Sequence, residues 1–346
     1  MKPLGRRIQI ARGSELDEVD RLPAETEQVQ FTHRLTDDQF RHLAELLADR
    51  PDVHLRAYGG SDFGDLDFLR FFPSLRSFWI DAAFDGTTSL DGLRWVPDLE
   101  TLGVGRTRRP LSLHILGDLR HLRVLWIEGQ SRDLDVISSL PIETLRLRSI
   151  TLPDLDLLTH LDRLRTLWLG LGGTSDLRRL PELSHLEELE IWQVRGLTDL
   201  TPIGGVLSLR RLFLQALPRV QRLPDLHRLE HLERVTLHTM KGITDLTPLR
   251  SCPALTTLML TAMPQLKPEA LRPLVGHPSL RRGSWNIGSM RQTYLAHDVL
   301  PIEPEPYGYA AWRAGVPYRE ILADWTRAVQ KGTHEVDGRM VAVDDG

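Results

Sequence analysis

The chain has 346 residues, of which 41% are hydrophobic and 26% are charged, an ordinary composition for a folded, soluble protein. Its net charge of −4, from 43 basic and 47 acidic residues, gives no reason to expect a nucleic-acid or membrane surface. The one cysteine, Cys252, cannot form an internal disulfide, and no apolar run has the length of a signal peptide or a membrane span. We therefore expect a cytoplasmic monomer that binds neither nucleic acid nor membrane.

A six-residue pattern recurs along the chain. Leu186-Glu-Glu-Leu189-Glu-Ile191 returns at steps of 23 residues, with apolar side chains at positions 1, 4 and 6. This alternation predicts a short strand, and a repeat in the twenties is typical of a leucine-rich repeat solenoid. Alignment on position 4 gives strand centres at Ile8, Val29, Val53, Phe78, Leu102, Leu125, Leu145, Leu167, Leu189, Leu212, Val235 and Leu258, with a degenerate thirteenth at Gly283.

These strand centres predict an α/β solenoid, a leucine-rich repeat horseshoe. We expect about 13 short parallel strands on its concave face, with turns and short helices on its convex face. The chain is divided into atypical N-terminal repeats and a cap over residues 1–74, regular repeats over 75–290, and a C-terminal cap over 291–346.

The N-terminal turns contain two helix-start signals. Ser14 with Asp17 resembles a capping box that opens a short helix, and Thr36 with Gln39 opens a longer one. The apolar face of the longer helix is formed by Phe40, Leu43 and Leu47.

The return legs of the regular repeats are short and contain proline. Leu197-Thr-Asp-Leu200-Thr-Pro-Ile203 and Ile243-Thr-Asp-Leu246-Thr-Pro-Leu249 are near copies. Thr and Asp favour local hydrogen bonds in turns, and Pro limits helix length. We predict turns or short 3₁₀ segments here, with a true helix only at Pro268–Val275.

The Thr-Asp-Leu-Thr-Pro legs resemble the internalin-type leucine-rich repeats of bacteria, over roughly residues 75–290. The resemblance implies the repeat architecture and no particular ligand. Position 9, often asparagine in that family, is apolar in the later repeats, so these turns are more similar to cysteine-containing or plant-resistance-type repeats. An apolar position 9 packs into the core, where asparagine would hydrogen-bond the turn. The residues in question are Val194, Leu217, Met240 and Met263.

The repeat pattern ends after Arg291. Leu300–Pro306 is proline-rich and predicts a stiff, extended connection. Residues 318–331 have the spacing of an amphipathic helix, and Val336-Asp-Gly-Arg339 predicts a hairpin turn. Two interpretations stay open, a cap over the last core edge and a separate tail that binds a partner.

No motif in the chain carries the chemistry of catalysis, and we expect no enzyme activity, cofactor or metal. His227 and His231 have metal-ligand spacing, but His231 precedes a position-1 leucine, as other histidines do, so we interpret the pair as structural. Gly170-Leu-Gly-Gly173 lacks the lysine of a phosphate-binding loop and predicts a tight turn.

The informative feature is the set of side chains that the strands point outward, at positions 3, 5 and 7. Four of the eight tryptophans fall on positions 5 and 7, and Trp and Arg dominate binding hot spots. We therefore predict a partner-binding surface made of Trp79, Trp126, Arg146, Arg148, Trp168, Glu190, Trp192, Arg211, Phe213, Arg234 and His238. The alternative is a purely structural role, in which a terminal segment folds over this face and buries it.

The function that this surface indicates is a non-catalytic scaffold that recognises a protein or peptide partner on its concave face. The alternative is recognition of a small molecule or glycan by the tryptophan row. A deep pocket between Trp126 and Trp168 would favour the small ligand, and a shallow open band would favour a protein.

Overall fold

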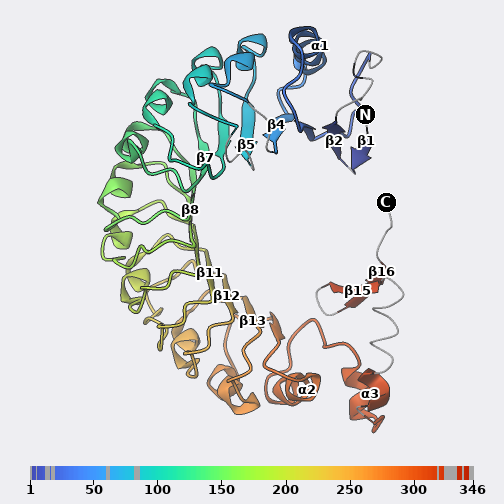
Figure 1. The fold of residues 1–346 in the computed structure, drawn as a ribbon. Coiled ribbons are helices and arrows are strands. Elements are labelled where there is room, and N and C mark those ends of the chain that lie inside the picture. The colour runs from blue at the N-terminus through green and yellow to red at the C-terminus, as the bar shows by residue number, and fades with distance from the viewer. Residues whose placement is uncertain are drawn as a thin grey trace. The chain divides into compact units, whose positions relative to one another are not determined.

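The computed structural model describes residues 2–4, 6–11, 16, 20–59, 63–81, 86–317, 319–322, 333–336 and 339–342. The chain divides into two compact units, residues 1–172 and 173–346. Within each unit the repeat strands lie side by side in sequence order, and the short helices follow the opposite side of the repeats (Figure 1). The helix predicted from Ser14 and Asp17 falls outside the described residues.

The first unit contains eight parallel repeat strands, preceded by one antiparallel strand. The strands are β1 (Lys2–Leu4), β2 (Arg7–Ile10), β3 (Gln28–Phe31), β4 (His54–Tyr58), β5 (Ser77–Asp81), β6 (Thr101–Val104), β7 (Val124–Glu128), β8 (Thr144–Arg148) and β9 (Thr166–Gly170). The α-helix α1 (Asp37–Leu47) is followed by the 3₁₀ helices η2 (Asp67–Phe71), η3 (Asp91–Trp95), η4 (His114–Asp118), η5 (Leu134–Ser139) and η6 (Asp156–His160).

The second unit contains five parallel repeat strands, followed by a helical segment and a strand pair. The strands are β10 (Glu188–Trp192), β11 (Arg211–Gln215), β12 (Arg234–His238), β13 (Thr257–Thr261) and β14 (Arg282–Trp285), then the antiparallel pair β15 (Thr333–Val336) and β16 (Arg339–Ala342). The helices are η7 (Leu180–Glu182), η8 (Thr201–Gly205), η9 (Thr247–Ser251), η10 (Pro268–Leu274), α2 (Met290–Val299) and α3 (Tyr309–Arg313).

The predicted leucine-rich repeat fold is confirmed, and the 13 parallel strands β2–β14 match the expected number. Positions 4 and 6 point into the core, as Leu189 and Ile191 illustrate with no exposed surface. One strand centre was wrong: Val29 and Phe78 both align with Leu55, not with Val53. The error arose because Val53, Leu55 and Ala57 alternate with polar residues, so a shift of two keeps the same polarity.

The return legs form the predicted short 3₁₀ helices, begun by side-chain turns. The Asp199 Oδ1 atom accepts the Thr201 N–H at 2.9 Å, and the Asp245 Oδ1 atom accepts the Thr247 N–H at 2.8 Å. The prediction of a true helix at Pro268–Val275 was wrong, because Pro268–Leu274 is 3₁₀. The α-helix comes later, at Met290–Val299, where the Ser289 side chain accepts the Gln292 N–H.

Directly after the strands, position 8 adopts the left-handed backbone conformation in successive repeats. In the first unit this holds for Gly129, Ser149 and Leu171, and in the second for Gln193, Ala216, Thr239 and Ala262, with φ between 50° and 67°. In this conformation the backbone N–H of position 8 still donates to the next repeat strand, as Ala216 N donates to His238 O at 2.9 Å. The next residue enters the core, and Leu217 and Met240 are fully buried.

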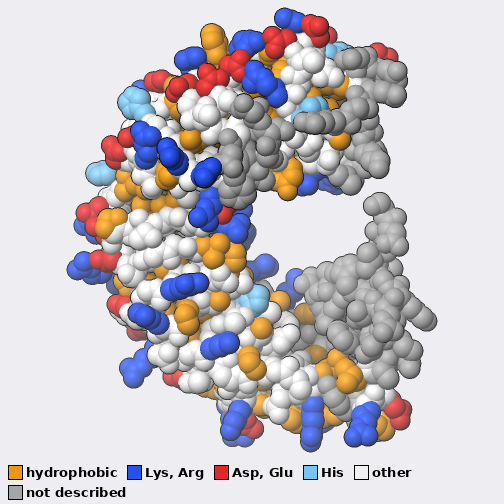
Figure 2. All heavy atoms as spheres, in the orientation of Figure 1, with side chains coloured by type: hydrophobic (Ala, Val, Ile, Leu, Met, Phe, Trp, Pro, Cys, Tyr) orange, Lys and Arg blue, Asp and Glu red, His pale blue; other side chains and the backbone are white. Residues whose placement is uncertain are grey.

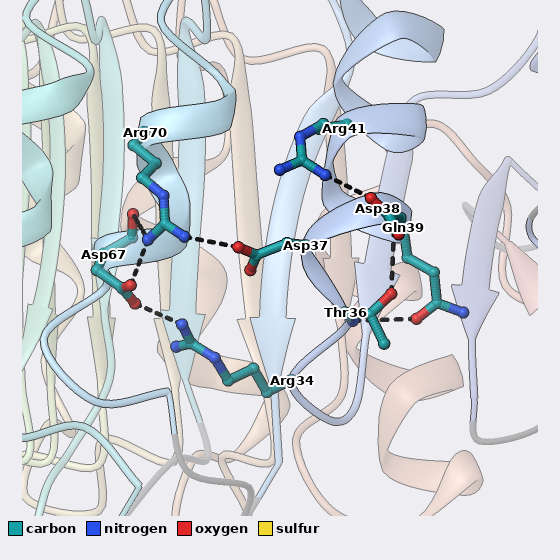
Figure 3. A network of polar contacts seen from close by, with 8 residues as sticks. All are labelled: Arg34, Thr36, Asp37, Asp38, Gln39, Arg41, Asp67 and Arg70. Carbon is teal, nitrogen blue, oxygen red and sulfur yellow. Dashed lines mark hydrogen bonds and ion pairs between the residues drawn. The ribbon is translucent and has the colours of Figure 1, made fainter.

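Helix α1 packs against the N-terminal repeats, and its capping box forms as predicted. Thr36 Oγ1 accepts the Gln39 N–H, and Gln39 Oε1 accepts the Thr36 N–H. Beside it, Arg70 reaches Asp37 on α1 and Asp67 on its own helix (Figure 3). Underneath, Phe40 stacks on Phe68 with 4.9 Å between ring centroids, so an aromatic cluster closes this end.

The last repeat strand of the second unit is closed by Trp285. At the degenerate Gly283, an added Cβ would lie 2.4 Å from the Ile302 Cδ1 atom and 2.9 Å from the Trp285 ring. Gly283 is therefore required because Trp285 and Ile302 fill the slot that leucine occupies elsewhere. The Trp285 indole donates to Leu300 O, and Gly283 N donates to Glu303 O at 2.8 Å.

The predicted hairpin is present, with Val336 opposite Arg339. Of the predicted amphipathic helix over 318–331, only 319–322 belongs to the described residues, and these four are helical.

Candidate functional site: the outward face of the repeat strands

The outward side chains of the strands form the face that we call the strand face, the concave face of the sequence-based prediction. In the first unit its central row is in register across neighbouring strands. The residues at position 5 are Trp79, Gly103, Trp126, Arg146 and Trp168. The three tryptophans are half-buried and Arg146 is exposed, so the row borders solvent and is not part of the core.

Trp79 and Trp126 stack on each other although a strand lies between them. Their ring centroids are 4.9 Å apart, with 30° between the ring planes. The intervening residue is Gly103, where an added Cβ would lie 2.4 Å from two atoms of the Trp79 ring. The absence of a side chain at position 103 therefore lets the Trp79 indole lie across β6 and reach Trp126.

Trp168 lies over a second glycine. An added Cβ at Gly170 would approach the Trp168 ring to 2.7 Å, so the ring rests on the end of its own strand. The predicted tight turn at Gly170–Gly173 begins in the strand, and the left-handed residue is Leu171.

Arg146 and Arg148 project from β8, between Trp126 on one side and Trp168 on the other. The Arg148 Nε atom lies 3.4 Å from a Glu128 carboxylate oxygen, and the two side chains are 35% and 20% exposed. Arg146 has no hydrogen-bond or ion-pair partner for its guanidinium among the described residues. Its five N–H donors are available to a ligand.

Beyond Trp79, a polar network that the sequence-based prediction missed continues the row. Arg56 binds the Asp81 carboxylate with two nitrogens, at 2.7 and 2.5 Å, and donates to Gln30 at 3.2 Å. Gln30 donates to Gln9 at 2.8 Å. Arg56 also lies over the Tyr58 ring, 4.4 Å from its centroid. Placing the strand centre at Leu55 would have identified Arg56 as a position-5 residue.

The second unit carries the other predicted site residues, in a different arrangement. At position 5, Glu190 aligns with Phe213, and at position 7 Trp192 aligns with Gln215 and then His238. At position 3, Glu188 pairs with Arg211 at 2.5 Å, and Arg234 follows on the next strand. These side chains are half-buried apart from Arg211 and Arg234, which are exposed. The predicted residues thus form two groups, one in each unit.

The described residues offer no cluster of His, Cys, Asp or Glu that could hold a metal ion. His227 and His231 lie in a turn, and His227 Nδ1 is 2.8 Å from Asp225. Burial raises the pKa of the Cys252 thiol to about 11, so it is a poor nucleophile.

Two cavities of about 310 and 500 Å³ lie beside α2, and a third of about 510 Å³ lies beside α1. Their walls include none of the predicted site residues.

Among the described helices, none combines the length and apolar character that crossing a bilayer requires. No protein-family model matches the chain, and no curated protein does either.

Comparison with solved structures finds internalins of Listeria monocytogenes. One internalin is 20% identical, with a TM-score of 0.48, and the match covers 74% of this chain and 78% of that one. An internalin C2 is 24% identical, with a TM-score of 0.39, and covers 58% of this chain and 78% of that one.

Proposed function

We propose that this protein is a non-catalytic binding scaffold that recognises a protein or peptide partner through the strand face. The repeats of such proteins stack into extended surfaces suited to long partners. The core positions hold the fold, which leaves positions 3, 5 and 7 available for recognition.

The observation that carries the proposal is the in-register row of Trp126, Arg146 and Trp168 on three adjacent strands. Two strand spacings place the tryptophans roughly 10 Å apart. Half-buried aromatic rings provide apolar anchors at little entropic cost, and an exposed arginine between them can bind a carboxylate. Such a row fits a partner that presents an apolar group beside an acidic one.

The test is to use the protein as bait in extract from its own organism and to measure the affinity of the captured partner. Trp126→Ala/Trp168→Ala should weaken that affinity by at least about 2 kcal/mol, as truncation of hot-spot residues does. Trp95→Ala is the matched control, because Trp95 is 44% exposed but belongs to a 3₁₀ helix of the same unit.

Equal affinity of the wild type and the double variant would remove the aromatic row from the proposal. Thermal melts of all three proteins should stay cooperative. A collapsed melt of the double variant alone would show that the two indoles serve packing and not recognition.

A further inference from the structure

The strand face of the second unit has a basic edge. At position 3, β11, β12 and β14 carry Arg211, Arg234 and Arg282, with Thr257 between the last two. From β11 to β14, positions 3, 5 and 7 contain no aspartate or glutamate. Figure 2 shows Lys and Arg side chains exposed over this part of the chain. The chain as a whole has a net charge of −4, so this edge has the opposite sign.

The guanidinium groups of this edge are open to a ligand. Arg234 and Arg282 are exposed, and neither guanidinium has a partner among the described residues. Arg211 pairs with Glu188, but the two side chains are 60% and 34% exposed. An ion pair this accessible contributes little free energy, so Arg211 can exchange Glu188 for a partner's carboxylate.

The six acidic residues between β10 and β14 all lie outside positions 3, 5 and 7, and four of them have local partners. Asp199, Asp225 and Asp245 lie in the return legs, where each accepts a backbone N–H two residues ahead. Glu233, next to Arg234 in the sequence, pairs with Arg210 at 2.6 Å. Two of the described acidic residues adjoin the edge from outside β11–β14: Glu188, which pairs with Arg211, and the exposed Glu303, which forms a backbone bridge with Arg282 but no ion pair with it. The positions 3, 5 and 7 of β11–β14 themselves add no negative charge.

The spacing of the arginines fits an extended chain that crosses the strands. Neighbouring strands lie about 4.8 Å apart, so Arg211 and Arg282 are separated by roughly 14 Å at the backbone. An extended segment advances about 3.4 Å per residue, so residues i and i+4 span a similar distance and point to the same side. Carboxylates at i and i+4 would meet Arg211 with Arg234 at one end and Arg282 at the other.

We propose that β11–β14 bind an extended acidic segment of a partner protein, with its carboxylates on Arg211, Arg234 and Arg282. This inference rests on the proposed function and adds the chemistry of the partner. Under such a segment, position 5 offers Phe213 and Met259 to its apolar atoms. A peptide is favoured over a nucleic acid because position 5 of β11–β14 provides one aromatic ring, that of Phe213. One ring is too few for the base stacking by which proteins bind single-stranded nucleic acids.

The test uses a fluorescein-labelled peptide of twelve residues in which Glu alternates with Thr, and the same peptide with Gln for Glu. Fluorescence anisotropy at low salt should show the Glu peptide binding at least about tenfold more tightly, with an affinity that falls as salt screens the charges. Arg234→Gln/Arg282→Gln should weaken Glu-peptide binding by about tenfold or more.

The matched control is Arg222→Gln/Arg228→Gln, which removes the same charge from exposed return-leg arginines of the same unit. It should bind the Glu peptide as the wild type does. Equal binding of the Glu and Gln peptides would overturn the proposal, and so would equal losses in the two double variants. Equally tight binding of a twelve-nucleotide oligothymidylate through Arg234 and Arg282 would also overturn it. No residue of the aromatic row is changed here, so the Trp126/Trp168 test stands independently of this result.

Discussion

The two units of the molecule have the same interior and different exteriors. Both bury positions 4 and 6, and both turn position 8 into the left-handed region. On the strand face they diverge: at position 3 the first unit has hydroxyl residues such as Thr144 and Thr166, and three of the five strands of the second unit have arginine. At position 5 the first unit has three tryptophans, and the second has a single aromatic residue, Phe213. Packing limits the inward positions, so recognition can vary only on the outward ones.

The units also close their outer ends with different aromatic residues. Phe40 is fully buried among the phenylalanines near α1, and Trp285 is 2% exposed at β14. If each end is a true core, Phe40→Ala and Trp285→Ala should each cost about 3–5 kcal/mol, because both leave a large cavity. Urea unfolding of the two variants provides the measurement. A small loss for only one of them would mean that the corresponding end is not closed by that ring.

Position 8 offers a sharper comparison, because the first unit has a glycine there and the second has none. Thr239 is β-branched at φ 53°, and left-handed backbone costs roughly 1–2 kcal/mol for residues other than glycine. Glycine at 239 removes that strain but raises the conformational entropy of the unfolded chain. Thr239→Gly should therefore raise the free energy of unfolding by at most about 1 kcal/mol. Gly129→Ala should lose about the same amount for the opposite reason.

Urea midpoints test both changes. Space is not the obstacle at Gly129, where an added Cβ would meet the Arg106 side chain at an ordinary 3.4 Å. A gain for Gly129→Ala, or a loss for Thr239→Gly, would show that the left-handed turn is not a source of strain in this fold.

The smallest expected effect concerns pH and the return legs of the second unit. Hydrogen bonds from the Thr247 side chain and N–H lower the pKa of Asp245, and Thr201 lowers the pKa of Asp199 in the same way. A carboxyl whose pKa is lower in the folded state stabilises the fold above its unfolded value near 4. That contribution disappears as the pH falls through the lowered folded value.

Asp199→Asn/Asp245→Asn should therefore lose less stability than the wild type between pH 7 and pH 3. The asparagines keep an oxygen that accepts the backbone N–H but cannot titrate in this range. Urea unfolding at the two pH values measures the difference. Parallel losses in both proteins would show that these carboxylates do not contribute to acid sensitivity.

The sequence predicted those parts of the fold that depend on one residue's polarity or capping chemistry. Leu189 and Ile191 alternate with polar residues, which fixes their burial. Thr36 and Gln39 are three apart, which fixes the capping box. The left-handed turns were not predictable, because Gln193, Ala216 and Thr239 are not residues that favour that conformation. Helix α2 was missed, although Ser289 followed by Gln292 is a helix-start signal.

The candidate site was predictable as a set of positions but not as an arrangement. Periodicity placed Trp79, Trp126 and Trp168 on the strand face, where the structure also has them. It could not show the stacking of Trp79 on Trp126, because that depends on ring rotation over Gly103. Arg56 was missed because a shift of two residues in β4 leaves the polarity pattern unchanged.

The most direct test of the division between interior and strand face compares two neighbouring residues of β10. Leu189 is fully buried and Glu190 is half-buried on the strand face. Chemical denaturation should show that Leu189→Ala lowers the free energy of unfolding by roughly 2–5 kcal/mol, because it empties an enclosed slot. Glu190→Ala should lower it by less than about 0.5 kcal/mol. Equal losses would contradict the assignment of inward and outward positions, and with it every recognition residue proposed for the strand face.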